Sequence, residues 1–168
     1  MEEIINKVAS SGLKTINLEE FYPIGDRVLF DIKDQLWQGM ALREKDFRAF
    51  VETNSWEKYT NQFVAITCSV EAIIPTWAYM LLASALQPFA KKVVFGNLKE
   101  LDAIVCLEAL RQIDLKRYID ARVVIKGCGD IQIPETIFIE IVSQLKPIAK
   151  SIMYGEPCST VPIYKKSK

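Results

Sequence analysis

Histidine is absent from the 168-residue sequence. This absence excludes the commonest general base and metal ligand of proteins, together with every catalytic arrangement built on a Ser-His or Cys-His pair. Any chemistry at a site in this chain must therefore use cysteine, aspartate, glutamate, lysine, tyrosine or the backbone.

Net charge is absent as well, because 21 basic residues balance 21 acidic ones. No global electric field would draw the protein onto nucleic acid or onto an anionic membrane. The locally basic tail, which contains Lys165, Lys166 and Lys168, is interpreted as a solvated end of the chain. We therefore expect no nucleic acid and no membrane among the partners.

The sequence also has no apolar run long enough to cross a bilayer. Its most apolar stretch, Val70 to Leu86, is interrupted by Glu71 and Pro75 and falls short of the roughly 20 residues that a spanning helix needs. The first residues, MEEIINKVASSG, lack a basic region followed by an apolar one, so nothing marks the chain for secretion. These features predict a cytoplasmic protein.

Half of the residues are apolar and a quarter are charged, which is typical of a globular domain with a core. Short β-branched runs alternate with longer segments of helical spacing, and this order predicts right-handed crossovers and a largely parallel sheet. The strands are expected at residues 62–67, 92–95 and 122–126, and the helices at 2–10, 44–51, 75–89, 98–113 and 134–153.

The segment RVLFDIKDQLWQGMAL, which starts at Arg27, contains two strand-like runs around Lys33 and Asp34. These runs predict an antiparallel hairpin at the N-terminal side of the sheet. No linker of distinct composition divides the chain. We therefore expect one α/β domain over residues 1–168, with a mixed, mostly parallel sheet flanked by helices.

Two segments repeat the same pattern. VAITCSVEAIIPT and VVIKGCGDIQIPET both contain a strand, a cysteine, a nearby acid and an Ile-Pro that opens a helix. This pattern places Cys68 and Cys128 in loops at the carboxyl ends of strands, where open parallel sheets bind ligands. A third cysteine, Cys158, lies in the proline-bounded loop MYGEPCSTVPIY.

These three thiols predict a shared metal site, with Asp130 or Glu156 as a further ligand. Thiolates favour zinc or an iron-sulfur cluster, and the predicted function is that of a cytoplasmic metal- or iron-sulfur-related binding protein. Cys106, which lies in the helical run LDAIVCLEAL, is interpreted as a core residue.

Two alternatives remain open at this point. Cys128 could be a thiol nucleophile with Lys126 as its nearest basic neighbour in the sequence. Alternatively, the protein is a non-catalytic protein-interaction module whose loop cysteines are incidental. The apolar helix expected from Pro75 to Leu86 bears on the second alternative, because an exposed face on it would pair two copies of the chain as a homodimer or bind a protein partner.

Four stretches of the sequence resemble an uncharacterised bacterial family, domain of unknown function 2480. The stretches are LFDIKDQLWQG, AITCSVEAIIPTWAYMLLASAL, AKKVVFGNL and MYGEPCSTVPIYKK. The resemblance covers nearly the whole chain and implies an association with iron-sulfur cluster assembly, but it implies no activity.

A second resemblance concerns the order of elements alone. A hairpin followed by strand, helix, strand and helix, from Arg27 to Ile113, is similar to the STAS and anti-sigma-factor-antagonist domains, which are binding modules. In those domains an Asp-Ser-Ser-Gly opens the helix after the strand and its serine is phosphorylated. Here Ile74-Pro75-Thr76-Trp77 occupies that place, so the resemblance does not extend to a phosphorylation switch.

Overall fold

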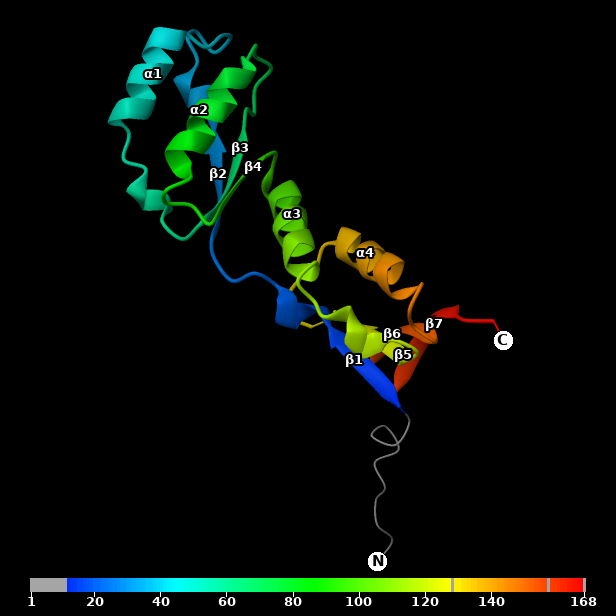
Figure 1. Ribbon diagram of the computed structural model, residues 1–168. Coiled ribbons are helices and arrows are strands. Elements are labelled where there is room, and N and C mark those ends of the chain that lie inside the picture. The colour runs from blue at the N-terminus through cyan, green and yellow to red at the C-terminus, as the bar shows by residue number, and fades with distance from the viewer. Residues whose placement is uncertain (1–11, 128, 157, 168) are drawn as a thin grey trace, which may run out of the picture. The chain divides into compact units, whose positions relative to one another are not determined.

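The computed structural model describes residues 12–127, 129–156 and 158–167 (Figure 1). The described residues form two compact units: unit 1 comprises those within residues 1–23 and 106–168, and unit 2 comprises Ile24–Val105. The predicted helix at residues 2–10 lies outside the described residues. The expectation of a single domain over residues 1–168 stays a prediction.

Unit 2 is built on a three-stranded parallel sheet in the order β2-β3-β4. Its strands are β2 (Arg27–Asp31), β3 (Phe63–Thr67) and β4 (Lys92–Phe95), and its helices are α1 (Glu44–Thr53), α2 (Thr76–Leu86) and the first part of α3 (Leu98–Leu110). Both crossovers, from β2 to β3 and from β3 to β4, step in the same direction, and right-handed connections therefore place α1 and α2 on one face of the sheet. Figure 1 shows these two helices side by side.

The core of unit 2 lies between those helices and the sheet. In α1, Phe47 and Val51 are buried and four residues apart, so they lie on one face of the helix. In α2, Ala78, Leu82 and Leu86 repeat the same spacing. The rings of Phe30, Phe50, Trp56 and Tyr59 contact one another in this core.

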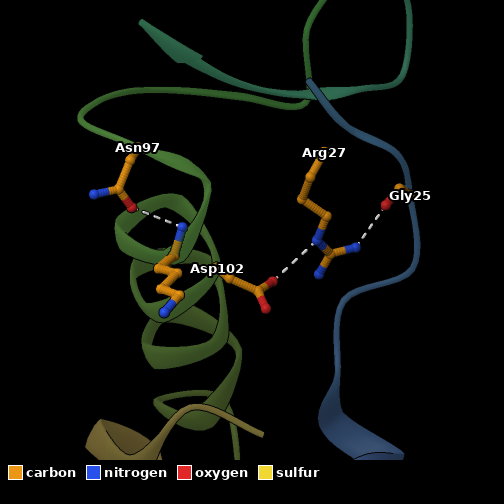
Figure 2. A network of polar contacts seen from close by, with 5 residues as sticks. Gly25, Arg27, Asn97 and Asp102 are labelled. Carbon is orange, nitrogen blue, oxygen red and sulfur yellow. Dashed lines mark hydrogen bonds and ion pairs between the residues drawn. The ribbon is translucent and has the colours of Figure 1, made fainter. Parts of the chain in front are cut away.

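The start of α3 is fixed by a capping box. The Asn97 side chain accepts hydrogen bonds from the backbone amides of Lys99 and Glu100, at 2.8 and 3.1 Å, and Glu100 accepts from the Asn97 amide at 2.7 Å. One turn further on, Asp102 forms an ion pair with Arg27 at the start of β2, as Figure 2 shows. The guanidinium also donates to the Gly25 carbonyl and lies over the Phe63 ring. These contacts join α3 to the sheet of unit 2.

Unit 1 contains a four-stranded sheet in the order β1-β5-β6-β7, in which only the last pair is antiparallel. Its elements are β1 (Leu13–Asn17), β5 (Arg122–Lys126), α4 (Glu135–Leu145), β6 (Ser151–Glu156) and β7 (Ser159–Lys165). The buried positions Ile137, Ile141 and Leu145 repeat every four residues along α4. The crossover from β5 to β6 therefore brings one apolar face of α4 onto the sheet.

The predicted mixed α/β fold with mostly parallel strands is confirmed. The strands divide into two sheets, however, and the antiparallel pair is β6-β7 at the C-terminal side. After β2 the chain turns into the 3-10 helix η2 (Ile32–Gln35), and the Asp31 side chain accepts a hydrogen bond from the Lys33 amide there. Because this capped turn ends the strand, β2 pairs with β3 and not with a hairpin partner.

The predicted helix at residues 134–153 is divided. The α-helix ends at Leu145, and residues 151–156 form β6 between β5 and β7. Pro147, which has no amide hydrogen, stands just after the helix end. The similarity to STAS domains is not confirmed.

Candidate functional site

Of the three predicted cysteine ligands, the two that the structure describes, Cys68 and Cys158, lie on different sheets. Cys68 follows β3 in unit 2, where its thiol donates to the Val70 carbonyl at 3.3 Å. Cys158 is exposed in the turn between β6 and β7 of unit 1. Cys128 lies outside the described residues. The repeated strand-cysteine-helix pattern therefore comes from two different sheets, so the carboxyl ends of its strands do not form a common edge.

The predicted function as a three-cysteine metal-binding protein is wrong. No group of three or more Cys, Asp or Glu side chains that could hold a metal ion occurs within residues 12–127, 129–156 and 158–167. Of the two acids proposed as extra ligands, Asp130 is exposed, and Glu156 forms an ion pair with Lys126 at 2.7 Å. The roles of the single residues and the cofactor, zinc or an iron-sulfur cluster, stay predictions. Cys106 is buried, as expected.

The carboxyl edge of the sheet in unit 1 carries charged groups that pair with one another. The hydrogen bond from Lys126 to Glu156 raises the pKa of the lysine; partial desolvation opposes this shift, and the charges of Glu156, Glu19 and Cys158 add to it. Glu19 in turn accepts a hydrogen bond from the Gly129 amide. A protonated lysine can stabilise a neighbouring thiolate by its charge, but the charge of Lys126 is paired with Glu156. The alternative of a thiol nucleophile at Cys128 stays a prediction, because that residue lies outside the described residues.

The carboxyl edge of the sheet in unit 2 is tied together by Asp31. Its carboxylate accepts from the backbone amides of Lys33 and Ser69, both at 3.1 Å, and so connects the end of β2 to the loop after β3. Burial opposes the charge on Asp31, but the hydrogen bonds from Ser69 and Lys33 outweigh it and lower the pKa of the carboxyl group. Asp31 is therefore a structural carboxylate that holds two loops in place.

Large apolar side chains are exposed at the carboxyl ends of β2, β3 and β4 and in the segments that follow them. Ile73 in the β3-α2 loop is 81% exposed, Phe95 at the end of β4 is 67% exposed and Met40 in the β2-α1 loop is 59% exposed. The two loops are linked by a backbone hydrogen bond from Ile73 to Met40 at 3.2 Å. We call the six exposed residues at these strand ends the apolar edge: Trp37, Met40, Val70, Ile73, Phe95 and Leu98.

The helix α2, which follows the β3-α2 loop, adds an uncharged surface. It contains no charged residue, and Thr76, Met80 and Ser84 are exposed at intervals of four residues, on one line along the helix. Tyr79 of α2 meets Phe95 edge to face, with ring centroids 5.1 Å apart. Sequence reasoning noted α2 but missed the apolar edge, because Met40 and Ile73 look like ordinary core residues in the sequence.

Unit 1 contains an apolar cavity of about 420 Å³ between α4 and the sheet. Phe138 of α4 and Tyr154 of β6 meet edge to face in its wall, with ring centroids 5.7 Å apart. Glu135, the first residue of α4, is the charged residue of the lining. A cavity of this size and character can hold a small organic molecule.

No helix within the described residues has the length and apolar character required to span a membrane. Two units in which helices connect mostly parallel strands place the protein in the class of α/β proteins. The model of a family described as protein of unknown function (DUF2480) matches residues 2–166, and the chain belongs to that family. No curated protein and no solved structure matches it.

Proposed function

We propose that this protein is a non-catalytic protein-interaction module that pairs with a second copy of itself through the apolar edge of unit 2. The observation that carries the proposal is the exposure of six large apolar side chains at the carboxyl ends of three parallel strands. That end of a parallel sheet is the usual place for binding. Clustered exposed apolar side chains are typical of surfaces that another protein covers.

The absence of charge on α2 favours a second copy as the partner. Two copies of an uncharged surface meet without electrostatic repulsion. A two-fold axis near Met80 would bring Thr76, Met80 and Ser84 of one copy against the same three residues of the other. A copy of the same chain is also present wherever the protein is made, so the apolar edge would be covered without a separate partner.

Charged residues beside the apolar edge support the same pairing. Arg43, whose guanidinium lies 3.9 Å from the centre of the Trp37 ring, and Glu71, next to Val70, are both exposed. In a contact with two-fold symmetry, Arg43 of each copy can face Glu71 of the other, so one pair of opposite charges is used twice.

The molar mass in solution tests the proposal. We expect light scattering to give about twice the chain mass of 19.1 kDa, and we expect the double variant Ile73→Glu/Phe95→Glu to give a monomer. Ile24→Glu is the matched control, because Ile24 is 88% exposed but precedes β2 at the opposite end of the sheet. A wild-type chain that stays monomeric at high concentration overturns the proposal. A dimer that the double variant leaves intact overturns the assignment of the surface.

A further inference from the structure

The cavity of unit 1 is open to solvent on one side and lined mainly by apolar and aromatic side chains. Its walls come from β5, β6, β7 and α4, and from Ile133 in the loop before α4. The apolar lining residues are Ile125, Ile133, Phe138, Val142, Tyr154 and Ile163. A volume of about 420 Å³ suits a compact molecule with one ring or a branched chain, since ligand cavities range from roughly 300 to 1,000 Å³.

One wall of the cavity is fixed by close packing against the backbone. A Cβ atom added at Gly127 would lie 2.8 Å from the Phe138 ring, so the ring rests directly on the chain just after β5. The edge-to-face contact with Tyr154 holds the same ring from the side of β6. The aromatic wall is therefore preformed, which lowers the cost of ordering it around a ligand.

Glu135 supplies the polar recognition. Its side chain is exposed, and its carboxylate makes no hydrogen bond or ion pair with any residue in the described part of the chain. As the first residue of α4 it stands where the amides of the helix terminus favour a negative charge. A negative charge beside aromatic faces favours a cation, because the faces of the rings attract positive charge as well.

We infer that this cavity binds a small organic amine, whose apolar body lies against Phe138 and Tyr154 and whose ammonium group pairs with Glu135. Complementary charge selects the amine over an alcohol or a carboxylate of the same shape, because only the ammonium both neutralises Glu135 and donates hydrogen bonds to it. The apolar body gives affinity to all three, and the carboxylate suffers repulsion. The site lies in unit 1 and is independent of the apolar edge in unit 2.

The probes are 2-phenylethylamine, 2-phenylethanol and 3-phenylpropanoate, which share a ring and a two-carbon linker but differ in charge. Titrations followed through the methyl resonances of Ile125, Val142 and Ile163 report on the cavity itself. We expect the amine to bind with a Kd on the order of 1 mM, as its few atoms allow, and roughly three- to ten-fold more tightly than the alcohol. The carboxylate should bind most weakly.

Two variants separate the charge from the cavity. Glu135→Gln should remove the preference for the amine and leave the binding of the alcohol unchanged, whereas Glu140→Gln, on the same helix but outside the cavity, should change neither. Val142→Phe should fill the cavity and abolish the binding of all three probes. The inference is overturned if no probe shifts these methyl resonances at 20-fold the expected Kd, or if Glu135→Gln retains the amine preference.

Discussion

Arg27 and Asp102 form an ion pair with 3.0 Å between the guanidinium Nε and the carboxylate oxygen (Figure 2). Arg27 stands at the start of β2 and Asp102 in the second turn of α3, so two segments 75 residues apart are joined through one contact. Both side chains are largely withdrawn from water, at 16% and 21% exposure. Salt screens the attraction within such a pair less than it screens a surface pair, and the contribution of the pair to stability depends more on good hydrogen-bond geometry.

We expect Asp102→Ala to lower the free energy of unfolding by about 2 kcal/mol, because the largely buried guanidinium of Arg27 loses a charged hydrogen-bond acceptor. Urea unfolding measures the loss. Glu44→Gln is the matched control, since the Glu44-Arg48 pair has a similar distance of 2.9 Å but exposures of 60% and 52%. Its loss should stay below about 1 kcal/mol. Equal losses in the two variants would contradict the structural role given to Asp102.

Gly155 lies in β6 with a φ of +120°, and a Cβ atom there would come within 2.7 Å of the Ser159 carbonyl oxygen. Gly155→Ala therefore meets both backbone strain and a clash with backbone in the β6-β7 hairpin. We expect a loss of about 3 kcal/mol in the free energy of unfolding. Gly39→Ala, which has a φ of +69° and open space around the added carbon, should cost only about 1 kcal/mol. Circular dichroism during thermal unfolding ranks the two variants, and a smaller effect at Gly155 would contradict this conformation of the hairpin.

Local patterns in the sequence predicted the parts of the fold that depend on near neighbours. The runs that became β3, β4 and β5 consist largely of β-branched and aromatic residues, and Pro75 and Pro134 each stand just before a helix. Strand β1 was missed because LKTIN is short and mixes polar with apolar residues. Strand β6 was absorbed into the preceding helix because SIMY continues an apolar spacing that either structure can produce.

The candidate site was harder to predict because it depends on which strands become neighbours. The similar contexts of Cys68 and Cys128 indicated one shared edge, but β3 pairs with β2 and β4, whereas β5 pairs with β1 and β6. No local pattern encodes that choice, since it depends on contacts between residues far apart in the sequence. Exposure is equally non-local, so the apolar side chains of Met40 and Ile73 could not be distinguished from core residues.

Asp31 provides a prediction about pH. Its pKa is lowered in the folded protein, so the unfolded chain binds more protons than the folded one as the pH falls below the ordinary aspartate value of 3.8. The stabilisation is therefore complete above that value and is lost as the pH falls through the folded pKa. Asp31→Asn removes the charge but keeps a side-chain oxygen to accept from Lys33 and Ser69.

We expect the wild-type protein to have a higher Tm than Asp31→Asn at pH 7, and this difference to shrink steadily below about pH 4. Thermal unfolding at several pH values measures it. Asp46→Asn, in the first turn of α1, is a suitable comparison because its carboxylate accepts no hydrogen bond from the described residues. A Tm difference at Asp31 that stays constant down to pH 2.5 would mean that the hydrogen bonds from Ser69 and Lys33 do not favour the charged form.

The proposed dimer predicts that the charges of Arg43 and Glu71 must be reversed together for the dimer to keep its affinity. Arg43→Glu alone would place two acids opposite each other at both symmetry-related positions of the contact, and Glu71→Arg alone would place two bases there. Each single variant should therefore raise the Kd of the dimer by roughly ten-fold. The double variant Arg43→Glu/Glu71→Arg restores opposite charges and should recover most of the lost affinity. Part of the loss will remain, because the guanidinium over the Trp37 ring is no longer present.

Sedimentation equilibrium at low and at high salt measures the dimer Kd of all four proteins, and the differences should diminish at high salt as the charges are screened. If the double variant dissociates more readily than either single variant, Arg43 does not face Glu71 across the contact, and the two-fold axis does not lie near Met80.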